Sequence, residues 1–181
     1  MPDSLLPLLT EKNRHDMLDF YNNHMEAKVR NRLNDYVQLD TLTEDFLHLT
    51  LSKVSTLEMK MLMTTDSVPI IVLVRTIGAP AQDSHVTFYN HDWQQLQWLH
   101  LPDSDTEDFF SDVPDSVRMD MSLVQRSIDD LRLVKASLSP EESVITLQVS
   151  VEELARDEKQ IARRYLVPVR YRWTGREFVK E

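Results

Sequence analysis

Residues 56–76 read TLEMKMLMTTDSVPIIVLVRT, and this stretch decides the fold class. From Leu57 to Met63 apolar and polar side chains largely alternate, which is typical of a β-strand with one buried face. Thr65-Asp66-Ser67 then supplies turn residues. Val68 to Thr76 is a nearly continuous apolar and β-branched run, which indicates a strand buried on both faces. The stretch predicts two antiparallel strands, the second being the most buried strand of its sheet.

Neighbouring patterns extend this sheet into an antiparallel meander. Alternating leucines predict a strand at 45–52. The first of the two strands described above is expected at 56–64. Gly78-Ala79-Pro80 ends the buried strand. Alternation resumes at 85–90, and 93–101 is expected to be extended.

The C-terminal half is expected to form two hairpins. Their strands are 131–138 with 143–150, and 167–173 with 177–180. Ser139-Pro140-Glu141-Glu142 and Thr174-Gly175 supply the two turns. A change of phase at Val134 in the first of these strands predicts a β-bulge.

Three segments have helical spacing. Thr10 is the expected N-cap of an amphipathic helix at 11–25, and 119–128 is compatible with a second helix. Ser150 and Glu153 have the spacing of a capping box, which predicts a third helix at 151–165. If Ser150 caps that helix, Ser150→Ala should lower the free energy of unfolding by about 0.5–2 kcal/mol.

These elements predict an α+β fold. We expect a single domain over 1–181, mainly antiparallel sheet with a helix near each end packed on one face. Both halves place a helix before antiparallel strands. The alternative is therefore two tandem helix-plus-sheet halves, 1–101 and 117–181, joined by the acidic segment 102–116.

Composition excludes several chemistries. The 181 residues contain only two glycines, Gly78 and Gly175, and no cysteine. Glycine-rich phosphate loops and nucleophile elbows need more glycine, and thiolate metal sites need cysteine. The formal net charge is −10, which argues against nucleic acid as a partner because phosphate contacts need clustered Lys and Arg.

The sequence offers no obvious membrane-spanning segment. Its longest uninterrupted apolar run, Ile70 to Val74, is far shorter than the ~20 residues that span a bilayer as a helix. The first residues, Met-Pro-Asp-Ser, lack the basic and apolar regions of a signal peptide. We therefore expect a cytoplasmic chain or a mature chain whose export signal has been removed.

The strongest candidate site combines aromatic and acidic residues around segment 102–116. Its members are Trp93, Trp98, Asp105, Asp108, Phe109 and Phe110. Exposed aromatic rings beside carboxylates would suit a cationic or sugar-like ligand. The other interpretation places the aromatic residues in the core beside a solvated acidic loop.

Other candidates have simpler explanations. His85, His91, Asp92 and His100 could converge on a metal, but none has the spacing of a zinc motif. The acids from Asp103 onward fail the calcium-loop pattern, because Asp108 and Pro114 stand where Gly and Glu are required. Met59, Met61 and Met63 are expected to face the core. We predict no catalytic pair, no cofactor and no metal.

The sequence also resembles a known family. The likeness rests on PDS at 2–4, PLLT at 7–10, MEAKVRNRL at 25–33, STLEMKML at 55–62, APAQDS at 79–84 and FYNHDW at 88–93. It is similar to an uncharacterised domain-of-unknown-function family of exported proteins from anaerobic Gram-negative bacteria. The resemblance implies a location in the periplasm or outer cell envelope and brings no activity with it. Family members often carry cysteines at the positions of Gly78 and Gln82, so this chain does not depend on such a pair.

These observations predict a non-enzymatic binding or assembly module of the cell envelope, with a protein, cationic or small-molecule partner. The alternative is a carrier that holds a small ligand between sheet and helices. A carboxylate-based envelope hydrolase is the third hypothesis.

Overall fold

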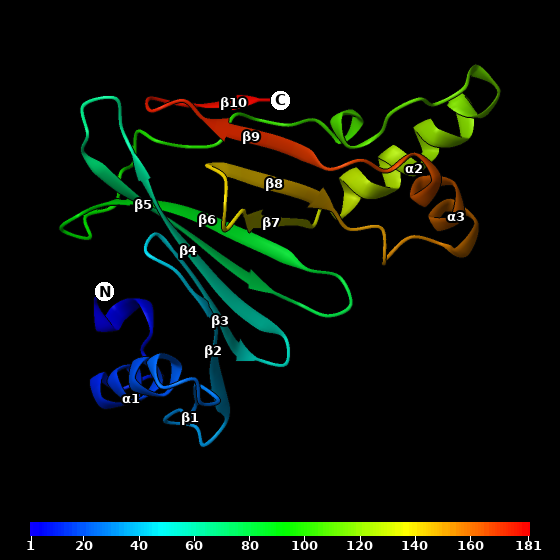
Figure 1. The fold of residues 1–181 in the computed structure, drawn as a ribbon. Helices are drawn as coiled ribbons and strands as arrows, with labels where there is room; N and C mark the ends of the chain where they lie inside the picture. Colours follow the sequence, from blue (N-terminus) through cyan, green and yellow to red (C-terminus); the bar gives the residue numbers. More distant parts are fainter.

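A six-stranded antiparallel sheet forms the body of the molecule in the computed structural model, which describes residues 1–181 (Figure 1). Its strands follow one another in chain order, as a meander. They are β1 (Lys28–Arg30), β2 (Tyr36–Leu42), β3 (Phe46–Ser52), β4 (Ser55–Met63), β5 (Pro69–Ile77) and β6 (Asp83–Asn90). Residues 56–76, the stretch that predicted two antiparallel strands, fall in β4, β5 and the turn between them. These strands pair without interruption, from Ser55 opposite Ile77 to Met63 opposite Pro69.

A second, four-stranded antiparallel sheet is built by the C-terminal part of the chain. It contains β7 (Val134–Leu138), β8 (Val144–Val149), β9 (Val169–Trp173) and β10 (Phe178–Lys180), in the order β10-β9-β8-β7. Two α-helices, α2 (Arg118–Asp130) and α3 (Arg156–Tyr165), pack on each other at one end of this sheet (Figure 1). The acidic segment contributes two short 3₁₀ helices, η2 (Thr106–Phe109) and η3 (Asp115–Val117).

The N-terminal residues cover the other side of the six-stranded sheet. A 3₁₀ turn, η1 (Asp3–Leu5), precedes α1 (Glu11–Asn22). Thr10 caps α1, since its hydroxyl accepts the N–H of Asn13 at 3.1 Å. The cap confirms the expected start of this helix, which ends three residues earlier than predicted because His24 has a φ of 57°.

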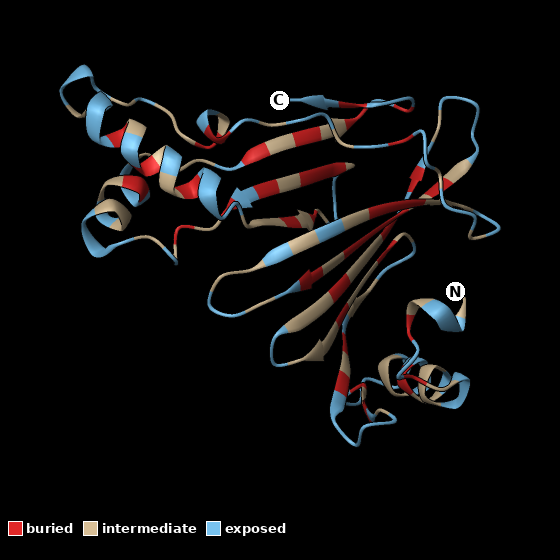
Figure 2. Cartoon of the chain, turned by 180° about the vertical axis from the view of Figure 1, so that it is seen from behind, coloured by how far each residue is buried: buried red, intermediate tan, exposed pale blue.

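The six-stranded sheet has a hydrophobic core on each face. Leu49, Leu57 and Leu73 belong to a cluster beneath α1 and the N-terminal segment, whereas Val72 and Val74 belong to a larger cluster shared with the second sheet. Strand β5 therefore enters both cores. This explains why its sequence is apolar on both faces and confirms that it is deeply buried (Figure 2).

Polar side chains join the two sheets. The Glu58 carboxylate on β4 accepts the N–H of Leu138 at 2.6 Å. Lys60, only 2% exposed, donates from Nζ to the carbonyl of Pro140 at 2.8 Å and pairs with Asp45 at 3.1 Å. Because a buried ammonium needs compensating partners, these contacts fix the β7–β8 turn against β4.

The fold confirms the α+β class, and some local predictions were wrong. The helix expected at 151–165 begins only at Arg156, because residues 151–154 form a turn. Val151 and Leu154, the first and last residues of this turn, pack in or against the core. Ser150 is therefore not its N-cap. Segment 93–101 forms turns, with one isolated bridge between Tyr89 and Gln95, in place of a strand.

The expected bulge at Val134 does not form, since β7 and β8 pair in regular register. The methionine prediction was right for Met59, which packs against the core beneath α1, and wrong for Met61 and Met63, which are 42% and 50% exposed. They share a face of β4 with Leu57, but the strand runs beyond the core beneath α1. Its inward residues there are Lys60 and Leu62, which face the second sheet.

Candidate functional site

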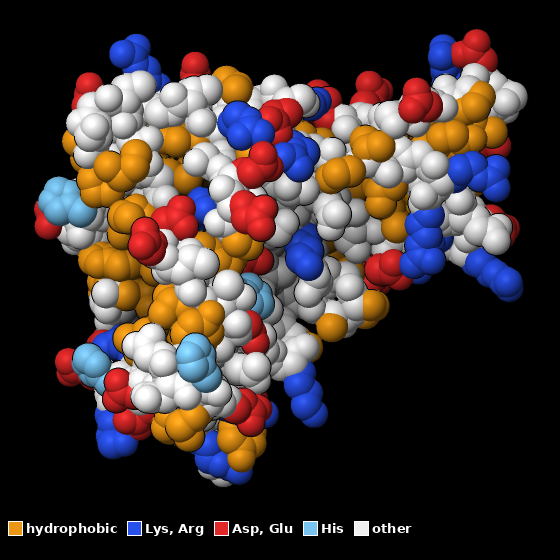
Figure 3. Space-filling model, viewed as in Figure 1, with side chains coloured by type: hydrophobic (Ala, Val, Ile, Leu, Met, Phe, Trp, Pro, Cys, Tyr) orange, Lys and Arg blue, Asp and Glu red, His pale blue; other side chains and the backbone are white.

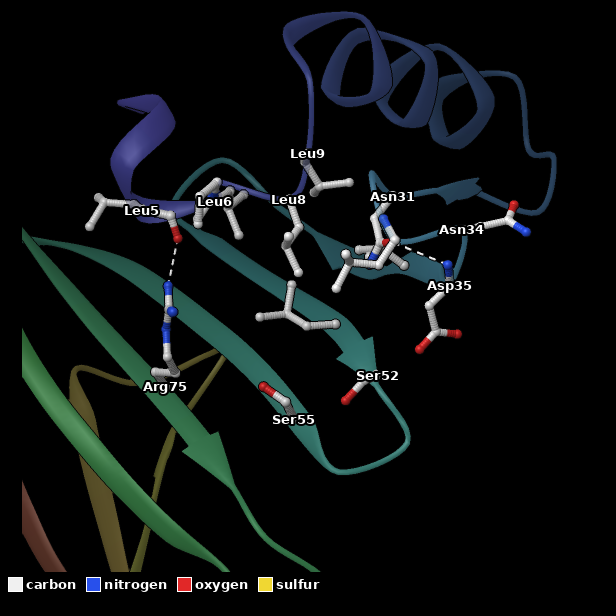
Figure 4. A pocket seen from close by; sticks show the side chains of 14 residues that line it. Leu5, Leu6, Leu8, Leu9, Asn31, Asn34, Asp35, Ser52, Ser55 and Arg75 are labelled. Atoms are coloured by element: carbon white, nitrogen blue, oxygen red, sulfur yellow. Dashed lines mark hydrogen bonds between the residues drawn. The ribbon is translucent and has the colours of Figure 1, made fainter.

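A groove of about 620 Å³ lies between the N-terminal segment and one end of the six-stranded sheet (Figure 4). We call it the N-terminal groove. Its walls are residues 5–9, the β1–β2 turn at 31–35, the β3–β4 turn at 51–55, and Arg75 on β5. Volumes of about 300–1,000 Å³ are usual for small-molecule sites.

Leucines dominate the inside of the N-terminal groove. Leu6 and Leu9 are almost fully buried, as is Val37 on β2. Leu8 and Leu33 stay 40% and 72% exposed at its mouth. Large exposed apolar side chains on both rims mark a surface that a ligand could cover.

Polar groups stand around these leucines. Figure 4 places Arg75 at one end of the groove and Asp35 at the other, with Ser52 and Ser55 along the sheet side. The Arg75 guanidinium donates from Nη2 to the carbonyl of Leu5 at 2.5 Å. A few placed polar groups in an apolar cavity are what orients a bound small molecule.

Hydrogen bonds to the main chain hold the N-terminal segment over the groove. Besides the Arg75 contact, the N–H of Arg32 donates to the carbonyl of Leu8 at 3.0 Å. Asn31 shapes the opposite turn by accepting the N–H groups of Leu33 at 2.9 Å and Asp35 at 3.1 Å. The groove is thus fixed on both sides by hydrogen bonds to main-chain atoms.

Hydrophobic side chains form a broken band along the edge of the molecule that carries the N-terminus, at the left of Figure 3.

A row of ionisable side chains crosses three strands on the opposite face of the sheet. The Asp40 carboxylate lies 3.0 Å from His48 Nδ1, and His48 stands opposite Glu58 in the β3–β4 register. Burial raises the pKa of Glu58 above its ordinary value, against the lowering effect of the Leu138 N–H, His48 and Lys135. No three His, Asp or Glu side chains in the chain are grouped so as to hold a metal ion.

Comparison with protein families gave a match over residues 1–178 to the model described as "Protein of unknown function (DUF3256)". The chain belongs to this family. A solved structure, described as "Structure of a domain of an uncharacterized protein from Porphyromonas gingivalis W83", is 27% identical in sequence with a TM-score of 0.77. The alignment covers 100% of this chain and 93% of that one. No protein with a curated description matches the chain.

The aromatic residues predicted to form a site lie in different parts of this DUF3256 fold. Trp93 contacts Tyr89 at a ring distance of 6.0 Å, beside the core under α1. Phe109 is fully buried in the other core, and Phe110 packs against that core. Trp98 is 63% exposed. The aromatic residues are thus not gathered on one surface, and Phe109 has the core position given by the second interpretation.

The acidic segment is tied to the body of the protein. Asp108 pairs with Lys180 at 2.5 Å, and this hydrogen bond lowers the pKa of Asp108. The carbonyl of Phe109 accepts the N–H of Val167 at 2.8 Å. Asp105 is exposed and is the N-cap residue of η2. A binding role for Asp105 and Trp98 therefore stays a prediction, while Asp108 already has a cationic partner within the chain.

The N-terminal groove was missed by the sequence analysis. Its signal is the short leucine-rich run from Leu5 to Leu9, interrupted by Pro7, which fits neither helical nor strand spacing. The ionisable row was missed because Asp40, His48 and Glu58 come together only through strand register. None of the three helices has the length and apolar character needed to cross a membrane.

Proposed function

We propose that this chain is a non-enzymatic binding module of the cell envelope whose site is the N-terminal groove. The occupant is a small, largely apolar molecule with a polar end. This combines the binding hypothesis with its carrier alternative, although the groove lies between the sheet and the irregular segment at 5–9 and not between the sheet and a helix. The envelope location rests on the sequence resemblance.

The shape and lining of the groove carry this proposal. Its volume of about 620 Å³ suits a small molecule, and its buried leucines supply an apolar surface that gains free energy when a ligand removes it from water. Arg75 and Asp35 at the two ends supply polar contacts for the ends of a ligand. Asp35 is the only carboxylate among the lining residues, so the groove lacks the pair of acids that the hydrolase hypothesis requires.

Native mass spectrometry of the protein purified from its own host tests the proposal. We expect a small molecule that remains bound to the wild-type chain and is lost from Leu8→Arg, which places a charge at the groove mouth. Leu123→Arg on α2 is the matched control, because Leu123 is 51% exposed compared with 40% for Leu8 and lies far from the groove. If the small molecule stays bound to the Leu8→Arg variant and is lost from the Leu123→Arg variant, its site lies outside the N-terminal groove.

Cell fractionation tests the location separately. An antibody against the chain should detect it in the envelope fraction of its host. Detection in the cytoplasmic fraction alone would exclude the envelope part of the proposal and leave the groove untouched.

A further inference from the structure

Arg75 has no counter-ion within the chain. It lies at one end of the N-terminal groove and reaches from β5 toward the carbonyl of Leu5 (Figure 4). Its side chain is half-buried. The other half-buried arginines, Arg14, Arg170 and Arg172, each pair with a carboxylate. A chain with 30 acidic and 20 basic residues thus leaves one partly buried guanidinium without an acid.

The remaining donors of Arg75 are accessible. A guanidinium has five N–H groups, and the carbonyl of Leu5 accepts one of them, from Nη2. Nε and Nη1 of Arg75 have no acceptor within the protein, and neither is a buried unpaired nitrogen, so both keep access from outside. Whichever Nη2 proton Leu5 accepts, one edge of the planar group keeps two parallel N–H groups. Such an edge binds both oxygens of a carboxylate.

The charges around the groove favour an anion at the Arg75 end. Arg75 and Asp35 are the charged residues that line the groove, at opposite ends. Arg32 and Lys53, in the turns that form its walls, are exposed and pair with no acid. His85 stands opposite Arg75 in the β5–β6 register and adds no negative charge. An anion beside Arg75 therefore meets mainly positive charge.

The carboxylates near the groove already have partners. Asp3, two residues before Leu5, pairs with Arg14 at 2.5 Å. Asp83, on β6 beyond His85, accepts the N–H of Val134 at 3.0 Å. Asp35 accepts the N–H of its neighbour Tyr36 at 2.8 Å. None of these acids forms an ion pair with Arg75, so its charge is left for a ligand.

We propose that the N-terminal groove binds a single-chain alkyl carboxylate. The carboxylate accepts hydrogen bonds from Arg75, and the hydrocarbon chain covers the leucines of residues 5–9, which gains free energy by removing them from water. The head group thereby lies at the end of the groove away from Asp35. This inference rests on the proposed function, because it names the ligand class of the same groove.

Calorimetric titration of the whole chain with three ligands of equal chain length tests the assignment. They are decanoate, 1-decanol and decyltrimethylammonium, used near neutral pH and below the concentrations at which they form micelles or separate from water. We expect decanoate to bind at least about tenfold more tightly than decanol, the effect of roughly one hydrogen bond to a charged group. Decyltrimethylammonium should bind most weakly, because its head group would meet the charge of Arg75.

Three variants locate the head group and the chain. Arg75→Met removes the donors and should make the affinities for decanoate and decanol equal; their ratio is measured because loss of the Leu5 contact affects both. Arg126→Met is the matched control and should leave the ratio unchanged, since Arg126 on α2 is exposed and also has no acid partner. Ser55→Trp fills the sheet side of the groove without altering Arg75. It should abolish binding of both ligands even if Arg75→Met does not fold.

The outcomes separate this inference from the proposed function. Equal wild-type affinities for decanoate and decanol, both lost in Ser55→Trp, would overturn the carboxylate assignment and leave the proposed function standing. A decanoate preference that persists in Arg75→Met, or tighter binding of decyltrimethylammonium, would also overturn the assignment. Decanoate binding that survives Ser55→Trp would place the ligand outside the groove. No binding of any of the three ligands would overturn both the inference and the proposed function.

Discussion

Glu58 and Lys60 show how single side chains hold two sheets together. Both point from β4 toward the β7–β8 hairpin, where they contact the N–H of Leu138 and the carbonyl of Pro140. Neither contact could be predicted from the sequence, because each joins residues 80 positions apart. Alternation predicted that these two residues would face away from the core, and only the position of the second sheet makes that side of β4 an interior.

Glu58→Gln should stabilise the protein at neutral pH. Burial raises the pKa of Glu58 in the folded state above the ordinary 4.5, so the folded chain holds this proton more tightly than the unfolded chain. Between 4.5 and the folded pKa, stability from this group therefore falls as the pH rises. Glutamine removes the ionisation and keeps an oxygen for Leu138.

Thermal unfolding of wild type and Glu58→Gln across pH 4 to 8 measures this effect. The variant should melt at a higher temperature at pH 7, and the difference should shrink as the pH falls toward 4.5. Glu153→Gln, at an exposed glutamate, is the control. A lower melting temperature for Glu58→Gln at pH 7 would mean that the ionised carboxylate contributes more than its burial costs.

At the scale of elements, the sequence predicted strands well where apolar and polar residues alternate regularly or where apolar β-branched residues form a continuous run. They failed where tertiary contacts override a local signal. Ser150 to Glu153 has the spacing of a capping box, but Val151 is buried in the core and the chain turns there before α3 begins. Strand β2 was not predicted because an irregularity near Asp40 interrupts its alternation, and β1 has only three residues.

The start of α3 should depend on Glu158 and not on Ser150. The Glu158 carboxylate accepts the N–H of Ala155 at 3.3 Å and the hydroxyl of Ser127 at 2.8 Å, which also joins α3 to α2. Chemical denaturation should show that Glu158→Ala lowers the free energy of unfolding by roughly 0.5–1.5 kcal/mol, the net value of a typical hydrogen bond. Ser150→Ala should change it by less than about 0.5 kcal/mol. The opposite ranking would restore Ser150 as the cap.

An exposed ion network fastens the β7–β8 turn to β9 and the C-terminus. Arg170 and Arg172 both pair with Glu142, at 2.8 and 3.3 Å, and with Glu181, at 2.9 and 2.5 Å. Hydrogen bonds from Arg170 and Arg172 lower the pKa of Glu142 and of Glu181 below 4.5. The stability that these groups add is therefore complete above pH 4.5 and lost as the pH falls through the lowered pKa values.

Glu142→Gln should lower the melting temperature slightly at pH 7 in low salt. Solvent screens exposed pairs, so the loss should be small, should disappear in 1 M salt and should shrink as the pH falls below 4.5. The neighbouring Glu141, which forms no ion pair, gives the control Glu141→Gln. An equal loss for both variants under all conditions would show that the network does not stabilise the turn.

At the scale of the whole molecule, the sequence predicted the α+β class, the hairpins and the buried strand β5. It did not reveal the candidate site. The N-terminal groove forms because Arg75 and Arg32 hold a leucine-rich segment over the sheet, and these contacts join distant parts of the chain. The segment itself has no regular spacing beyond the turn of η1, so no periodicity could indicate that it would roof a cavity.

A crystal structure of the protein purified from its own host tests the groove most directly. We predict continuous density for a bound small molecule in the N-terminal groove, in contact with Leu8, Leu33 and Leu51 and with a polar end near Arg75 or Asp35. A groove closed by direct contact between Leu8 and Leu33, with no bound molecule, would contradict the account.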